Sequence, residues 1–237
     1  MKLWVLTLFL ISPNYGELKD VQDLIQRFEA SIRAQEYDSI KLNYQRLRKL
    51  AKDKNDFLGD YISGLAIFKM LTADSSFRSG DFLDSAIYFI ERSISRKQDF
   101  SDSYVLLGSL YGLKITGNFT RAISLGKKSE EAFEKAKQLD PSNPRIYYLY
   151  GTGLFFRPKS FGGSQEKAKH NFITALNFYK KETNNPLSWG YLECKAFLGY
   201  AYEKTGFPDS AKIVYREILK EDSNYKWVKQ QLNRMKN

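Results

Sequence analysis

Apolar residues recur with a helical period along nearly the whole chain. After a first apolar run at residues 3–11, stripes with three- and four-residue spacing follow one another, separated by short turns rich in Gly, Pro, Asn and Asp. The stripe formed by Val21, Leu24, Ile25 and Phe28 is typical. The pattern predicts an all-α protein built from consecutive helix pairs. The first pair is expected at about residues 18–34 and 37–52, and a capping helix at residues 225–236.

A pattern of small and aromatic residues repeats from pair to pair. In the last pair, Gly199 is followed by Tyr202 and then by Ala211 and Tyr215. We expect Gly199 and Ala211 to face one another, because small side chains let two helices approach closely. Glycines in similar surroundings occur at positions 64, 108, 151 and 199, which are 44, 43 and 48 residues apart.

This arrangement resembles the tetratricopeptide repeat, whose basic period is about 34 residues. The resemblance implies a right-handed α-α superhelix of about five helix pairs plus the C-terminal cap, forming one domain over residues 17–237. Because the observed spacings exceed 34, repeats of the HEAT type, with about 40–47 residues, remain an alternative.

A narrower resemblance covers residues 101–181. Pro158 and Phe161-Gly162-Gly163 lie between two helices of one pair. They resemble the Pro-x-x-Phe-Gly-Gly turn of a poorly characterised family of tetratricopeptide-like proteins, and the region is also similar to the repeats of the regulators of microtubule dynamics. Pro158 is expected to end a helix, the glycines to allow positive φ, and Phe161 to fill the gap between the helices.

The N-terminus has the order of an export signal. Lys2 precedes the apolar run, Pro13 follows it, and Gly16 offers a small residue for cleavage. The run is too short to span a membrane as a helix. We predict a signal peptide at residues 1–16 and a secreted or periplasmic protein; a buried N-terminal helix or an uncleaved anchor is the alternative. Asn118 begins a glycosylation sequon, which matters only in an exported eukaryotic protein.

Composition and charge exclude several classes of protein. A single Cys rules out an internal disulfide, and a single His leaves few routes to a zinc site or a His-based triad. The net charge of +10 comes mainly from the C-terminal half, since residues 101–237 carry 22 basic and 13 acidic groups whereas residues 17–100 carry 14 of each. Such a half can attract nucleic acid, anionic lipid or an acidic protein, but its interleaved acids are also typical of an ordinary solvated surface.

Three features could carry chemistry, and each has a simpler explanation. Gly162-Gly163-Ser164 could form an anion-binding nest, but Ser164 is better placed as a helix N-cap. His170 lies among polar residues on a lysine-rich helix and is expected to be solvated. Cys194 is expected to be a packing residue, because no His is near it in the sequence. We therefore predict no catalytic residues, no metal site and no cofactor, and hence a protein that is not an enzyme.

The resemblance also implies a binding surface. In tetratricopeptide arrays the first helix of each pair lines a concave groove, and aromatic and Arg side chains are common interface anchors. The positions carried over to this chain are Tyr61, Phe68, Lys69, Arg145, Tyr148, Thr152, Phe155, Phe156, Tyr200, Glu203 and Lys204. The carboxylate clamp that binds chaperone tails in some relatives is absent.

The leading functional interpretation is a non-catalytic scaffold that binds a protein or peptide outside the cytoplasm, with a membrane-associated complex as one setting. The alternative is an exported accessory protein that binds a small ligand or a transporter subunit. A nucleic-acid-binding protein that uses the basic half is a third interpretation, and export argues against it.

Overall fold

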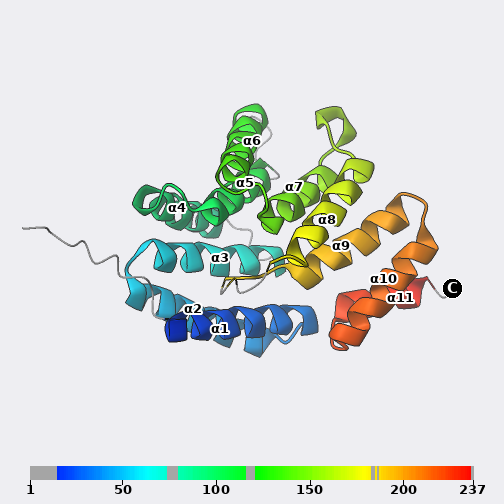
Figure 1. Ribbon diagram of the computed structural model, residues 1–237, viewed down its shortest axis with the longest axis horizontal. Coiled ribbons are helices and arrows are strands. Elements are labelled where there is room, and N and C mark those ends of the chain that lie inside the picture. Colours follow the sequence, from blue (N-terminus) through cyan, green and yellow to red (C-terminus); the bar gives the residue numbers. More distant parts are fainter. Residues whose placement is uncertain (1–14, 74–79, 116–120, 183–184, 186, 236–237) are drawn as a thin grey trace, which may run out of the picture.

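The computed structural model describes residues 15–73, 80–115, 121–182, 185 and 187–235, and this part of the chain contains eleven α-helices and no strand (Figure 1). The helices are α1 Tyr15–Ala34, α2 Tyr37–Lys54, α3 Phe57–Ala73, α4 Gly80–Arg96, α5 Ser101–Ile115, α6 Ala122–Leu139, α7 Pro144–Phe156, α8 Gln165–Tyr179, α9 Tyr191–Lys204, α10 Pro208–Glu221 and α11 Lys226–Arg234. They form five consecutive pairs and a capping helix, so the predicted all-α superhelix is confirmed. The predicted signal at residues 1–16 lies almost entirely outside the described residues and stays a prediction, as does glycosylation of Asn118.

Helix ends follow the capping signals in the sequence. Asn143 caps α7, with its side-chain oxygen accepting a hydrogen bond from Arg145 N at 3.0 Å, and Pro144 occupies the first turn, where a missing N–H costs nothing. Ser164 caps α8 in the same way, accepting from Lys167 N at 3.2 Å. This contact supports the capping interpretation of Ser164 over the anion nest.

Four glycines make room for large side chains of the partner helix. A Cβ atom on Gly199 would lie 2.5 Å from the Tyr215 ring, and one on Gly151 would lie 2.9 Å from the Phe172 ring. The equivalent contacts of Gly64 and Gly108 are with Ile90 and Phe133. The expectation that Gly199 faces Ala211 was therefore wrong, since the glycine receives the aromatic ring one helical turn further along α10.

The turn between α7 and α8 depends on both of its glycines. Gly162 adopts a φ of 83°, and a Cβ on Gly163 would lie 1.8 Å from the Arg157 carbonyl oxygen. Phe161, however, does not fill a gap between helices as expected, because its side chain is 61% exposed. The backbone hydrogen bonds from Phe161 N and Gly163 N to Pro158 O hold the turn without it.

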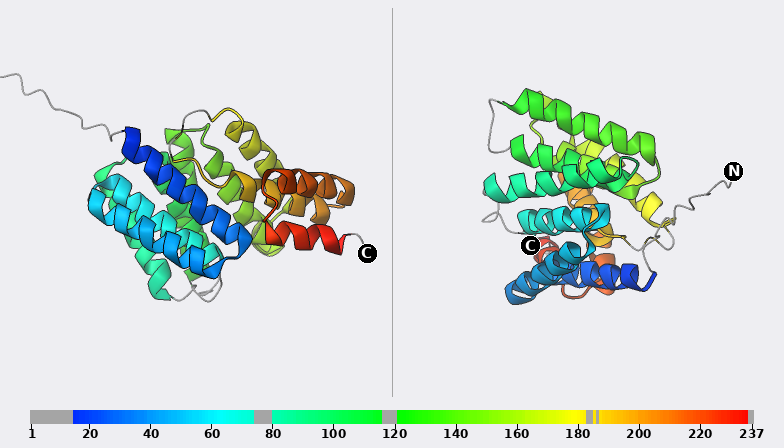
Figure 2. Two further views of the ribbon diagram at one scale, coloured as in Figure 1. Left: turned by 90° about the horizontal axis from the view of Figure 1, so that it is seen from below. Right: turned by 90° about the vertical axis from the view of Figure 1, so that its left-hand side faces the viewer.

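The first helices of successive pairs form the inner layer of the superhelix. Helix α3 contacts α5, α5 contacts α7, and α7 contacts α9, while α4, α6, α8 and α10 lie outside them (Figure 1). Helix α3 is buried on all sides from Leu58 to Leu71. Helix α1 contacts α11, so the two ends of the described chain meet and the superhelix closes on itself (Figure 2). None of the described helices is both long enough and apolar enough to cross a membrane.

Candidate partner-binding site

The eleven residues predicted to line the groove all lie on first helices, but the structure divides them into two groups. Six are buried: Tyr61, Phe68 and Lys69 on α3, and Arg145, Tyr148 and Phe155 on α7. Five are half-buried or exposed: Thr152 and Phe156 on α7, and Tyr200, Glu203 and Lys204 on α9. Only part of the predicted groove surface is therefore accessible to a partner.

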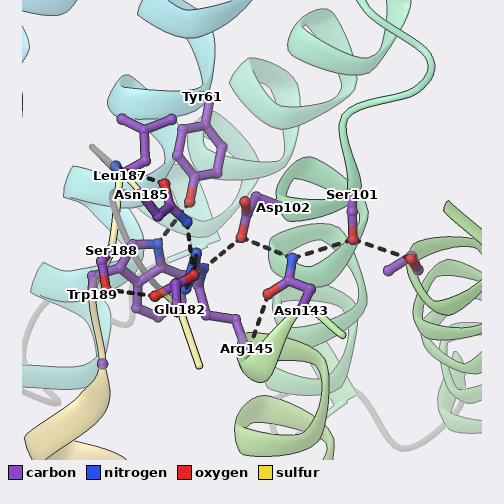
Figure 3. A network of polar contacts seen from close by, with 12 residues as sticks. Tyr61, Ser101, Asp102, Asn143, Arg145, Glu182, Asn185, Leu187, Ser188 and Trp189 are labelled. Carbon is purple, nitrogen blue, oxygen red and sulfur yellow. Dashed lines mark hydrogen bonds and ion pairs between the residues drawn. The ribbon is translucent and has the colours of Figure 1, made fainter. Parts of the chain in front are cut away.

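Trp189 covers five residues of the first group, namely Tyr61, Phe68, Lys69, Arg145 and Tyr148. This residue lies in the connection between α8 and α9 and is only 1% exposed (Figure 3). Its indole nitrogen donates a hydrogen bond to the Tyr61 hydroxyl at 2.7 Å. Lys69 Nζ lies 4.5 Å from the indole centroid, and the Tyr148 ring meets the indole edge-on at 6.5 Å. The inner face of the N-terminal half therefore binds a side chain of its own protein.

The backbone around Trp189 is held as firmly as its side chain. Tyr179 donates a hydrogen bond from its hydroxyl to the Trp189 carbonyl oxygen at 2.7 Å. Gly190 N donates to Glu29 Oε1 at 3.0 Å, and Gln22 Nε2 donates to Ser188 O at 2.9 Å. Because Gln22 and Glu29 belong to α1, the N-terminal helix and the α8–α9 connection seal the inner face together.

Arg145 is the centre of a buried ion network rather than a free anchor. It is 1% exposed, and its guanidinium donates to Asp102 at 2.6 Å and to Glu182 at 2.7 Å (Figure 3). Asn143 adds a hydrogen bond to the same Asp102 oxygen at 3.1 Å. Burial alone would lower the pKa of Arg145, but the charge of Asp102, with smaller contributions from Glu182 and nearby tyrosines, outweighs burial and the pKa is raised. With both carboxylates engaged, the network is a structural element that joins α5, α7 and the end of α8.

A second buried ion cluster joins the two ends of the described chain. Arg33 on α1 donates to Glu193 on α9 at 2.9 Å and to Asp222, the residue that caps α10, at 2.7 Å. Glu29 pairs with Lys69, and burial together with the charge of Glu193 raises the pKa of Glu29 despite this cation. Removing one partner of this cluster would leave an uncompensated buried charge, so each member is needed for the contact between the two ends of the described chain.

The second group borders a row of aromatic rings that crosses the inner helices α7 and α9 and the capping helix α11. We call Phe155, Phe156, Tyr200 and Trp227 the aromatic strip. Ring centroids are 5.1 Å apart for Phe155 and Phe156, 5.1 Å for Phe155 and Tyr200, and 5.7 Å for Tyr200 and Trp227. Phe156 is 63% exposed, whereas Tyr200 and Trp227 are half-buried.

Charged side chains lie beside the strip. Lys204 Nζ is 5.2 Å from the Tyr200 ring centroid, and Glu203 pairs with Arg234 of the capping helix at 2.7 Å. The strip thus offers apolar ring surface bordered by cations, the combination typical of interface anchors.

Sequence reasoning missed the contacts of two tryptophans. Trp189 lies outside the helical stripes, and nothing in the sequence pattern places it on α3. Trp227 packs on the apolar side of the capping helix, and its contact with Tyr200 of α9 was not foreseen. The feature of the sequence that could have drawn attention to both residues is the low number of Trp residues, since the chain has only three.

The other chemical candidates take structural roles. His170 is exposed, and its Nδ1 lies 2.8 Å from the Glu166 carbonyl oxygen. Cys194 is fully buried, and burial, with the charge of Glu193 as a smaller cause, raises the pKa of its thiol. Within the described ranges, no three His, Cys, Asp or Glu side chains are placed to hold a metal ion.

Comparison with known proteins supports the fold through solved structures. No protein-family model matches the chain, and no curated protein matches it. A tetratricopeptide-repeat protein of Thermus thermophilus, TTC0263, superposes with a TM-score of 0.61 at 14% identity, covering 91% of this chain and 98% of the other. The chain is thus a tetratricopeptide-like helical repeat protein.

Two further structures share the fold. The HusA haemophore of Porphyromonas gingivalis has a TM-score of 0.63 at 20% identity, with 81% of this chain and 94% of HusA covered. PilF of Pseudomonas aeruginosa has a TM-score of 0.52 at 16% identity, with coverage of 79% and 68%. Both likenesses concern the fold of the chain.

Proposed function

We propose that this protein is a non-catalytic scaffold that binds a protein or peptide partner through the aromatic strip. The observation that carries the proposal is the exposed Phe156 at the end of a continuous row of rings that reaches Trp227. Large rigid side chains at partly desolvated positions supply most of the energy of protein interfaces. The sealed N-terminal inner face leaves this C-terminal segment as the accessible part of the predicted surface.

The state of the polar groups supports a non-catalytic role. The inward-facing charges of Arg145, Lys69 and Arg33 are all engaged in ion pairs with carboxylates of the same chain. The thiol of Cys194 is buried and its pKa is raised, which is the opposite of an activated nucleophile. Binding is therefore the role best supported by the exposed residues.

The test is selection of peptides from a displayed random library on the wild-type protein, followed by affinity measurement on variants. Phe156→Ala and Tyr200→Ala should each weaken a selected peptide about tenfold or more, equivalent to about 1.4 kcal/mol. Phe161→Ala is the matched control, because Phe161 is equally exposed but lies in the α7–α8 turn. Equal losses for Phe156→Ala and Phe161→Ala, or no loss for either, would contradict binding at the strip.

We further propose that the scaffold works outside the cytoplasm, on the order of charged, apolar and small residues in the first sixteen positions. N-terminal sequencing of the protein recovered from its source organism tests this. A mature chain beginning near Glu17 is the expected result, and a chain that retains residues 1–16 contradicts cleavage.

A second candidate function is binding of a small apolar ligand at the same strip. The half-buried ring of Tyr200 between Phe155 and Trp227 favours it, and one of the fold neighbours is a haemophore. Haemin titration followed by absorbance, on wild type and Tyr200→Ala, separates the two. The small-ligand function is supported if haemin binding requires Tyr200 and the peptide library yields no binding peptide.

A further inference from the structure

The surroundings of the aromatic strip are strongly cationic. Arg157 directly follows Phe156, Lys204 lies over the Tyr200 ring, and Arg234 belongs to the helix that carries Trp227. The cations at the C-terminal ends of α7 and α9 and along α11 are Arg157, Lys159, Lys204, Lys226, Lys229 and Arg234, and the carboxylate of Glu203 lies beside Lys204. Glu203 is itself compensated, by Arg234 at 2.7 Å and by Lys204 at 3.7 Å.

Other carboxylates of the inner layer do not offset this charge. Glu193 on α9 is paired with Arg33, and Asp102 and Glu182 are paired with Arg145. Arg157 forms an ion pair with Glu130 of α6, which lies outside the inner layer, at 3.0 Å. Lys159, Lys226 and Lys229 have no ion pair among the described residues. Lys204 and Arg234 share the single carboxylate of Glu203, so a ligand at the strip meets ring surface bordered by a net positive charge.

We propose that the strip binds an acidic segment of a partner protein that carries large apolar side chains. This inference rests on the proposed scaffold function and adds the class of its partner. The apolar side chains of such a segment would pack on Phe156 and Tyr200, and its carboxylates would pair with bordering cations such as Lys204. Charge complementarity of this kind selects partners and speeds association, while the rings supply the affinity.

Ring geometry favours an acidic peptide over single-stranded nucleic acid. Bases stack on open aromatic faces. Here two of the three neighbouring ring pairs of the strip meet edge-to-face, Phe155 and Phe156 at 74° and Tyr200 and Trp227 at 89°, while Phe155 and Tyr200 are tilted at 39°. Such a surface fits branched or aromatic side chains between its rings better than a row of parallel bases.

The experiment is fluorescence anisotropy with a fluorescein-labelled peptide of alternating Glu and Leu, using the full-length mature chain. Two control peptides replace all Glu by Gln or all Leu by Ser. The Glu-Leu peptide should bind at least about tenfold more tightly than either control. Its affinity should fall severalfold when salt rises from about 50 to about 300 mM, since exposed charges are screened over this range.

Protein variants locate the site. Phe156→Ala should weaken the Glu-Leu peptide about tenfold or more and Lys204→Glu about threefold or more. Phe161→Ala and Lys167→Glu, which alter equally accessible residues away from the strip, should change it less than about twofold. Circular dichroism and melting curves of all four variants should match wild type, because each changed side chain is exposed.

Each outcome separates this inference from the scaffold function. Equal binding of the Glu and Gln peptides, lost in Phe156→Ala, overturns the acidic partner and leaves the scaffold. If neither charged nor neutral peptides bind in a Phe156-dependent way, both proposals fail. Tighter Phe156-dependent binding of single-stranded oligonucleotide than of the Glu-Leu peptide overturns the inference in favour of nucleic acid.

Discussion

Replacing Trp189 by Ala tests whether the inner face is sealed by the chain's own side chain. The indole is buried, and truncation of a core Trp typically costs about 3–5 kcal/mol. The change also leaves the Tyr61 hydroxyl without the hydrogen bond that it accepts from Trp189 at 2.7 Å, and an unsatisfied buried polar group adds about 1–3 kcal/mol. We therefore expect a loss of about 4 kcal/mol or more in the free energy of unfolding, measured by urea denaturation.

The cavity left by Trp189→Ala should accept free indole. Ligand that binds the folded state stabilises it by RT ln(1 + [L]/Kd), which is about 2.7 kcal/mol at a hundred times Kd. Indole should raise the melting temperature of the variant and leave that of wild type unchanged. Trp227→Ala is the matched control, because Trp227 is half-buried at the strip and its truncation should cost clearly less.

Two results would refute this reasoning. One is a loss below about 1 kcal/mol for Trp189→Ala, which is the scale of an exposed substitution. The other is equal stabilisation of wild type and variant by indole, which would place the indole site elsewhere. In either case the inner face of the N-terminal half would again be a candidate for partner binding.

Three further predictions concern packing, reactivity and pH. Gly199→Ala should destabilise the fold by about 1–3 kcal/mol, because the new Cβ would meet the Tyr215 ring. Gly153→Ala should stabilise α7 by about 0.5–1 kcal/mol, because the space around Gly153 is open. The two variants should therefore shift the melting temperature in opposite directions. Cys194 should react with Ellman's reagent about a hundredfold more slowly in the native than in the unfolded chain, and equal rates would contradict its burial. Burial raises the pKa of Glu29 in the folded state, so the folded state takes up a proton before the unfolded state does as pH falls towards about 4.5. The free energy of unfolding of wild type should therefore rise relative to that of Glu29→Gln over this range. A rise for the variant relative to wild type would contradict the prediction.

Local patterns in the sequence predicted the helices and which of them form the inner layer. Residues 18–34 and 37–52 were expected to be helical, and α1 and α2 extend beyond these bounds by only a few residues. The predicted cap at Ser164 uses a neighbour three positions away, so short-range spacing was sufficient to find it. The groove positions likewise lie on α3, α7 and α9, because a repeat determines which helix faces inward.

Contacts between distant parts of the chain decided which of those positions remain accessible. Trp189 reaches Tyr61 across 128 residues, and Arg33 reaches Asp222 across 189. No period or spacing encodes such pairs, because they depend on how far the superhelix turns before its ends meet. The sequence by itself determined an all-α repeat protein with aromatic inner helices. Only the tertiary structure decided that α1 and Trp189 cover the N-terminal half of that face and leave the rings from Phe156 to Trp227 bordered by a net positive charge. The physical reason is that burial is a property of the closed assembly of helices and not of any one of them.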